Sequence, residues 1–223
     1  MTYAIPIGGP YPAAHPEHAI IEAAKRDFLS QCYEKALAVG AVVEIGTMRY
    51  DGVAADGRST LLFAQLCKRD HRRFISIDNS PQAIETASIA LRRENLNNVE
   101  LMLGDGECVL AQLDGKIALL YLDAGDDPRQ ALAQFQAAED WLADGAVVVL
   151  DDCHSYEAMN IPRTWGQPMP EGKGTLVLPY LRDGILARTP PHTRDGWVQV
   201  VRVREAWAMA CAIWLSNTID RPQ

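Results

Sequence analysis

The sequence predicts one α/β domain in three layers, in which helices cover both faces of a doubly wound, mostly parallel sheet. Short apolar runs of strand length alternate with longer segments of helical periodicity. The apolar runs are rich in Val, Ile and Leu, which is typical of parallel strands buried on both faces. A chain of 223 residues can bury such a sheet without disulfides or metals.

The first part of the chain predicts helices and strands in alternation, after an irregular start rich in Pro and Gly. Apolar residues recur at helical spacing up to Gly40, which is a suitable helix stop. Ser80 as N-cap and Pro81 at the first helical position indicate where a later helix begins. The predicted elements are a helix over 16–39, a strand over 41–45, a helix over 60–69, a strand over 74–78 and a helix over 81–95.

The alternation continues to about residue 150. The next predicted elements are a strand over 99–103, a short helix after Gly106, a strand over 117–123, a helix over 128–143 and a strand over 146–150. Asp127 is the expected N-cap for the helix over 128–143, and Gly145 suits its end. Crossovers between parallel strands are right-handed, so few topologies remain.

The C-terminal part departs from this alternation. The predicted elements are a helix over 175–181, strands over 185–188 and 197–203, and a helix over 207–215. The gap between these two strands is too short for a helical crossover, so they should pair antiparallel. The sheet then has seven strands with an antiparallel C-terminal strand. The last helix is apolar on much of its surface, and we expect it to dock on the body or on a second subunit in a homodimer.

Composition and charge exclude several classes of protein. The formal net charge of −8 argues against a nucleic-acid partner bound through a broad basic face. No apolar run reaches the roughly 18 residues of a membrane span, and no signal peptide is visible. The five cysteines are scattered and form no CxxC pair, which indicates reduced thiols and predicts a cytoplasmic location.

Acidic residues lie at the end of every predicted parallel strand or just after it. The acids are Glu44, Asp78, Asp105, Asp123 and the pair Asp151-Asp152. In an open parallel sheet, ligands bind just beyond the carboxyl ends of the strands. We therefore expect these acids to share one ligand site.

These residues resemble those of the class I S-adenosylmethionine (SAM) dependent methyltransferases over about residues 42–203. The segment after the first strand resembles the glycine-rich SAM loop, Asp78 resembles the acid that holds the ribose, and Asp105 the residue that meets the adenine amino group. The resemblance implies a cofactor-binding set of Glu44, Gly46, Thr47, Gly57, Ser59, Asp78, Asn79, Asp105, Gly106 and Asp123.

Physical reasoning agrees with this assignment. Gly46 lets the backbone approach a ligand, and the N-terminus of the helix near Thr60 suits the carboxylate of SAM. Asp78 offers two acceptor oxygens to a ribose diol. The alternatives are a tight turn for the glycines and an N-cap for Asp78, although Ser80 is better placed to cap. A nicotinamide-binding domain would need G-x-G-x-x-G in a short turn, which does not follow Gly46.

Three carboxylates suggest a metal site. Asp123, Asp151 and Asp152 follow neighbouring strands, whose ends lie about 5 Å apart, and together they suit Mg²⁺, or Mn²⁺ or Ca²⁺. An ion would also relieve their mutual repulsion. The arrangement is similar to the metal-dependent, catechol-type O-methyltransferases, which carry Asp-Asn where this chain has Asp151-Asp152. The alternatives are that Asp151 and Asp152 cap a helix or loop, and that Asp126 and Asp127 cap the helix from Pro128.

The catalytic base is less defined. The resemblance implies a lysine shortly after Asp123, but residues 124–127 contain none. His154 is the predicted base or metal ligand, since its ordinary pKa of about 6.5 suits proton transfer near neutrality. Asp123 is the second predicted catalytic residue, because it would hold the ion that orients the substrate hydroxyl.

The sequence predicts four parts within the single domain. These are an N-terminal segment and helix (1–40), a SAM-binding core (41–152), a lid loop (153–174), and a C-terminal hairpin and helix (175–223). About nine residues (48–56) interrupt the glycine motif, and we expect them to form a surface loop over SAM or substrate. Long loops in compact domains are often functional, which motivates the lid.

Three functions remain open from the sequence. The first is metal-dependent O-methylation of a hydroxyl on a small molecule. The second is a SAM-dependent methyltransferase without metal, acting on oxygen or nitrogen. The third is a non-methylating SAM-binding or hydroxylase-like relative, which the missing lysine keeps open.

Overall fold

The computed structural model describes most of the first two thirds of the chain and two C-terminal strands. The described residues are 16–36, 39–50, 58–125, 127–151, 173, 176–177, 196–203 and 206–214. The predicted strand over 185–188 lies outside them, as do most of the predicted lid and most of the predicted helix over 175–181.

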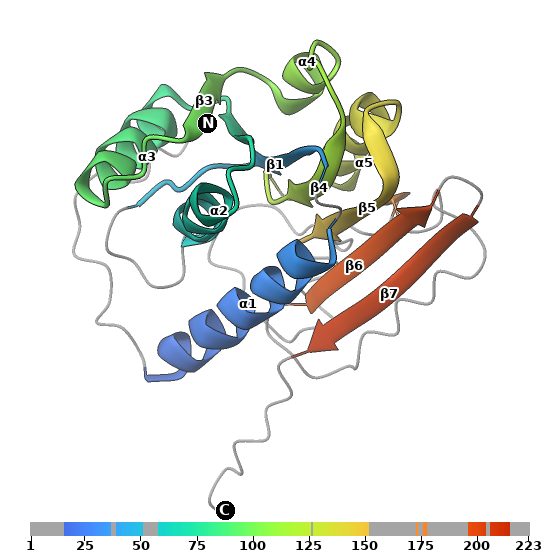
Figure 1. Cartoon of the computed structure of the whole chain (residues 1–223), viewed down its shortest axis with the longest axis horizontal. Coiled ribbons are helices and arrows are strands. Elements are labelled where there is room, and N and C mark those ends of the chain that lie inside the picture. The colour runs from blue at the N-terminus through green and yellow to red at the C-terminus, as the bar shows by residue number, and fades with distance from the viewer. Residues whose placement is uncertain are drawn as a thin grey trace, which may run out of the picture.

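A seven-stranded sheet with the order β3-β2-β1-β4-β5-β6-β7 forms the centre of the structure (Figure 1). Five strands run parallel: β1 (Ala41–Ile45), β2 (Phe74–Asp78), β3 (Val99–Leu103), β4 (Ile117–Leu122) and β5 (Leu142–Leu150). β6 (Gly196–Val203) pairs antiparallel with β5, and β7 (Ala206–Trp214) pairs antiparallel with β6. The mostly parallel α/β fold is confirmed. The order of the parallel strands reverses between β1 and β4, and such a switch point is where doubly wound folds bind ligands.

In the described part of the chain, five helices cover the two faces of the sheet. They are α1 (Pro16–Lys35), α2 (Arg58–Arg69), α3 (Pro81–Arg93), α4 (Gly106–Leu110) and α5 (Pro128–Glu139). Alternate strand residues point to opposite faces. On one face, Val42 and Leu119 pack in a core with residues of α1, α2 and α3. On the other, Val43 and Leu120 pack in a core with residues of α4 and α5.

N-caps predicted from the sequence stabilise the first turns of two of these helices. The Ser80 hydroxyl accepts a hydrogen bond from the backbone N–H of Ala83 at 3.3 Å, at the start of α3. The Asp127 carboxylate accepts one from the backbone N–H of Arg129 at 2.8 Å, at the start of α5. Both bonds satisfy donors that a helix N-terminus leaves unpaired.

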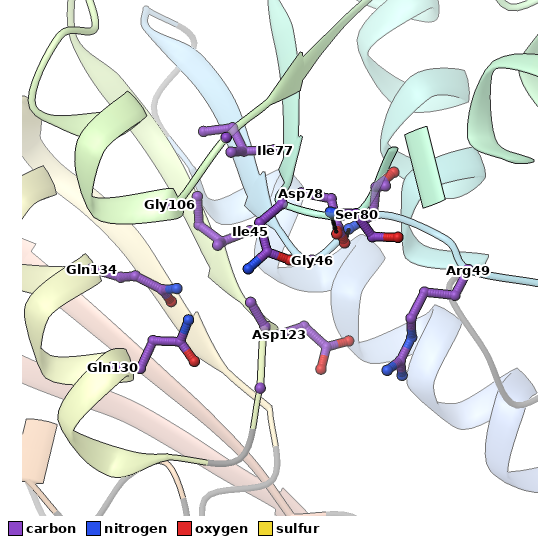
Figure 2. A pocket seen from close by; sticks show the side chains of 15 residues that line it. Ile45, Gly46, Arg49, Ile77, Asp78, Ser80, Gly106, Asp123, Gln130 and Gln134 are labelled. Atoms are coloured by element: carbon purple, nitrogen blue, oxygen red, sulfur yellow. Dashed lines mark hydrogen bonds between the residues drawn. The ribbon is translucent and has the colours of Figure 1, made fainter. Parts of the chain in front are cut away.

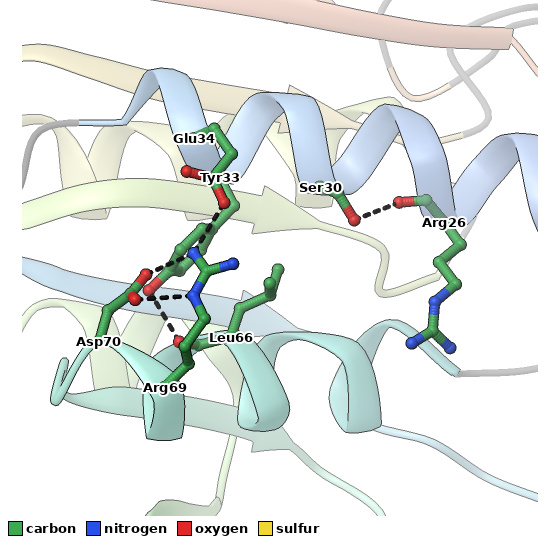
Figure 3. Close-up of polar contacts among 7 residues, drawn as sticks. All are labelled: Arg26, Ser30, Tyr33, Glu34, Leu66, Arg69 and Asp70. Atoms are coloured by element: carbon green, nitrogen blue, oxygen red, sulfur yellow. Dashed lines mark hydrogen bonds and ion pairs between the residues drawn. The ribbon is translucent and has the colours of Figure 1, made fainter.

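Figure 3 shows how α1 lies along α2. The Tyr33 hydroxyl donates to the backbone oxygen of Leu66 at 3.1 Å, and the Arg72 guanidinium lies 4.9 Å from the Tyr33 ring centroid. Arg69 pairs with Glu34 at 2.7 Å, which adds an exposed link between the two helices. The aromatic and apolar contacts carry most of this docking, because exposed ion pairs contribute little.

Two predicted helices end earlier than expected. The helix predicted over 16–39 ends at Lys35. The helix predicted over 128–143 ends at Glu139, and β5 already begins at Leu142, which pairs with Ile117. The register of this pairing shifts between Ile117 and Leu119, so β5 begins as an irregular extension that strand patterning alone did not reveal.

The predicted helix over 207–215 is wrong, because β7 occupies residues 206–214. The segment alternates small Ala with a larger residue in AWAMACAI, which is the period of a strand. Two residues separate β6 from β7, a length typical of a hairpin. The docking helix that motivated the homodimer is therefore absent from the described structure. No helix within the described ranges has the length and apolar character that a membrane span needs.

Candidate functional site

A cavity of about 320 Å³ lies beyond the carboxyl ends of β1, β2, β3 and β4 (Figure 2). Its volume is in the range of small-molecule sites. Six of the ten residues predicted to bind the cofactor line it: Gly46, Thr47, Asp78, Asn79, Gly106 and Asp123. The structure therefore brings together residues from the ends of four parallel strands.

Gly46 brings the backbone after β1 against the backbone after β4. Its φ is +94°, and a Cβ at this position would lie 2.6 Å from the backbone oxygen of Asp123. The Gly46 N–H donates to the Ile77 oxygen at 2.8 Å, and the Asp123 N–H donates to the Ile45 oxygen at 2.8 Å. A side chain at residue 46 would force these strand ends apart, so the cavity wall requires glycine.

Asp78, at the end of β2, holds two loop segments with its carboxylate. Its Oδ2 accepts from the Thr47 N–H at 3.0 Å, and its Oδ1 accepts from the Ser80 N–H at 2.8 Å. The side chain is partly exposed and lines the cavity. Each carboxylate oxygen has a second lone pair, so Asp78 can accept further hydrogen bonds from a ligand.

Asp105 lies between two residues that line the cavity but is not itself part of the lining. Its side chain is exposed, and its Oδ1 accepts from the Asn79 amide at 3.4 Å. Its neighbours Gly104 and Gly106 line the cavity. Asp105 is thus placed beside the cavity, and its contact with an adenine amino group stays a prediction.

Glu44 lies beneath the cavity and does not line it. The side chain is fully buried on the α2 side of the sheet, where its Oε2 accepts from Thr60 at 2.8 Å and from Ser76 at 2.6 Å. Burial raises the pKa of Glu44 to about 7, and the hydrogen bonds from Ser76 and Thr60 oppose that rise. Thr60 also accepts from the Met48 N–H at 3.0 Å, so this network holds the loop after β1.

The start of the interrupted glycine motif is partly buried. Met48 is only 1% exposed and packs with Ala87 and Ala90 of α3, so the predicted surface loop does not begin there. Arg49 is exposed, lines the cavity, and extends toward it in Figure 2. Ser59, in the first turn of α2, is buried and lies off the cavity lining.

Asp123 and Asp151, two of the three predicted metal ligands, meet at one hydroxyl. The Tyr121 hydroxyl lies 3.0 Å from Asp123 Oδ2 and 2.9 Å from Asp151 Oδ2. Burial raises the pKa of Tyr121 well above its ordinary value, and both carboxylates raise it further. Tyr121 therefore stays protonated, and its one hydrogen serves two carboxylates.

Lys173 completes this cluster and was not predicted from the sequence. Its Nζ lies 3.0 Å from Asp123 Oδ1, and the residue is only 2% exposed. It is the described residue of the predicted lid segment, 50 positions after its partner. The family pattern directs attention to the residues just after Asp123, and no local signal connects residue 173 with them.

Gln134 on α5 is a second residue that the sequence did not reveal. It is 1% exposed and lines the cavity, and neither its Oε1 nor its Nε2 has a hydrogen-bond partner within the described ranges. Gly106 leaves room for it, because a Cβ there would lie 3.0 Å from Gln134 Nε2. Figure 2 shows the amides of Gln134 and Gln130 pointing inward from the same helix. A buried amide with no partner is ready to bind a ligand.

Three predicted site residues, Gly57, Asp152 and His154, lie outside the described residues. Their predicted roles in binding the cofactor, binding a metal and taking up a proton stay predictions. Within the described part of the chain, no group of three His, Cys, Asp or Glu side chains is arranged to hold a metal ion.

Comparison with known proteins agrees with the fold. Residues 43–153 match the family model described as "Methyltransferase domain". O-methyltransferase hkm8 of Aspergillus hancockii is 25% identical over 112 residues, which cover 50% of this chain and 42% of that protein. The match thus spans less than half of that relative's length.

Solved structures share the fold at low identity. The O-methyltransferase TomG from Streptomyces achromogenes, solved in complex with SAM, superposes with a TM-score of 0.53 and 19% identity, covering 90% of this chain and 80% of that one. An rRNA methylase from Streptococcus thermophilus superposes with a TM-score of 0.55 and 17% identity, covering 87% and 100%. The fold is therefore common to methyltransferases with different substrates. By this family match, residues 43–153 belong to a methyltransferase domain of the class I SAM-dependent type, and an O-methyltransferase is among the curated relatives of the chain.

Proposed function

We propose that the chain transfers the methyl group of SAM to a hydroxyl of a small molecule. The observation that carries the proposal is the cavity at the switch point between β1 and β4, where Gly46, Asp78 and Asp123 meet. Hkm8 and TomG, whose names describe O-methyltransferases, support oxygen as the acceptor. The net charge of −8 disfavours a nucleic-acid substrate.

Each lining group has a task in this reaction. When bound, SAM supplies an electrophilic methyl on a positively charged sulfur. Asp78 accepts hydrogen bonds from the ribose diol, and Gly46 leaves the space in which that ligand lies. Asp123 places a carboxylate on the cavity wall, and its negative charge favours binding of the positively charged sulfur.

Catalysis then consists mostly of positioning. The hydroxyl oxygen of the substrate forms the new C–O bond, the methyl–sulfur bond breaks with its electron pair passing to sulfur, and a base accepts the hydroxyl proton. His154 is the predicted base. The predicted divalent ion is not part of this proposal, because the two described carboxylates of its site already contact Tyr121 and Lys173.

Calorimetry and product analysis test the proposal. The full-length protein should bind SAM and S-adenosylhomocysteine, and Asp78→Ala should weaken both. With a panel of phenols, sugars and peptides, S-adenosylhomocysteine should form when a hydroxylated small molecule is present. Absence of SAM binding, or product formation with peptides alone, would overturn the proposal.

A further inference from the structure

The Asp123–Asp151 pair carries more negative charge than its shared hydroxyl can balance. Tyr121 has a single hydrogen, yet it lies within hydrogen-bond distance of both carboxylates. Asp151 is only 4% exposed, so solvent screens it weakly. Two close carboxylates in such a place need a cation or a proton.

Lys173 supplies a cation at this place. Its ammonium contacts Asp123 Oδ1 at 3.0 Å, while Asp123 Oδ2 faces Tyr121. Both oxygens of Asp123 are therefore engaged by groups of the protein. A buried ammonium is stable only beside an anion, so Lys173 and the acid pair depend on each other.

We propose that Lys173 is the resident cation of the Asp123–Asp151 pair and takes the place of a divalent metal ion in this chain. A divalent ion bound at Asp123 would lie against the ammonium, and their repulsion opposes binding. The inference rests on the proposed function only in assigning this cluster to the methyl-transfer site.

The charge of the cluster supports the proposal. Within the described part of the chain, the two carboxylates and the ammonium leave a single negative charge, which matches the single positive charge of a sulfonium. A divalent ion in addition to Lys173 would add positive charge beside that sulfonium, and their repulsion opposes its binding. Lys173 is thus a positioning residue, which fixes the Asp123 carboxylate at the cavity wall.

Mn²⁺ alone is the probe for this inference. Its binding is measured by electron paramagnetic resonance, as a loss of the signal of the free ion. The wild-type chain should leave the signal of millimolar Mn²⁺ unchanged. Lys173→Met should bind Mn²⁺ at least about tenfold more tightly than the wild type, because the acid pair has lost its cation. Lys173→Arg should behave like the wild type, as should Lys68→Met, which removes an exposed lysine of α2.

Two results would overturn the inference. One is a wild-type chain that binds about one equivalent of Mn²⁺ and loses it in Asp123→Asn; this measurement needs no lysine variant to fold. The other is a folded Lys173→Met variant that, like the wild type, does not bind Mn²⁺. SAM binding is measured separately by calorimetry, so its failure would overturn the proposed function and leave the Mn²⁺ result to be judged alone.

Discussion

The backbone oxygen of Asp123 lies 2.6 Å from the point where residue 46 would carry a Cβ. Gly46→Ala should therefore destabilise the protein by at least about 3 kcal/mol, because the methyl meets backbone and the φ of +94° is strained for alanine. Urea unfolding measures this change.

Gly115→Ala is the matched control for that substitution. Gly115 also has a positive φ, of +83°, but a Cβ there would meet nothing within 4 Å. It should cost only the backbone strain, about 1 kcal/mol. Equal losses of unfolding free energy in the two variants would show that the close contact between the ends of β1 and β4 does not contribute to the cost at residue 46.

Glu44 should make stability depend on pH. Its pKa is raised from 4.5 to about 7 in the folded protein, so the folded state keeps a proton that the unfolded state gives up. The protonated Glu44 contributes to the free energy of unfolding below about pH 4.5, and this contribution is lost as pH rises through about 7. The loss is on the order of 3 kcal/mol.

Glu44→Gln tests this dependence, since glutamine has no charge to bury and its oxygen can still accept from Thr60 and Ser76. The unfolding free energy of the wild type should fall relative to this variant between about pH 5 and pH 8. Glu85→Gln, at an exposed position of α3, should follow the wild type. Parallel curves for wild type and Glu44→Gln would contradict the raised pKa.

The sequence allowed the parallel sheet and much of the cavity to be predicted, because both depend on local patterns. Apolar runs indicated β1 to β5. The acids at the strand ends predicted that Asp78 and Asp123 lie at the same edge of the sheet. The strand β7 was missed because its alternation of Ala with large residues was interpreted as a helical face. Lys173 and Gln134 could not be predicted, because their importance comes from burial and contact across the fold.

Asp78 should matter for ligand binding more than for stability. In Asp78→Asn the new amide would face one of the two backbone N–H donors, from Thr47 or Ser80, and the acceptor for a ribose diol would be impaired. We expect the affinity for S-adenosylhomocysteine to fall by about tenfold or more in calorimetry. Asp140→Asn, at an exposed position after α5, should leave it unchanged. Unaltered affinity in Asp78→Asn would remove Asp78 from the cofactor site.

Gln134 should affect stability and binding in opposite directions. Gln134→Leu replaces a buried amide that has no partner among the described residues by an apolar group of similar size. The unfolding free energy should rise by about 1 kcal/mol, because the desolvated polar atoms are gone. The affinity for S-adenosylhomocysteine should fall, because the cavity loses a donor and an acceptor.

Gln136→Leu, at an exposed position of the same helix, is the control for Gln134→Leu and should change neither quantity by much. Urea unfolding and calorimetry on the same protein samples separate the two effects. A Gln134→Leu chain that is less stable than the wild type, with unchanged affinity for S-adenosylhomocysteine, would show that this amide supports the fold. A Gln134→Leu chain that is more stable and binds S-adenosylhomocysteine more weakly would show the reverse. In that case α5 keeps an unsatisfied amide in the cavity wall, at a cost in stability, because a ligand satisfies it.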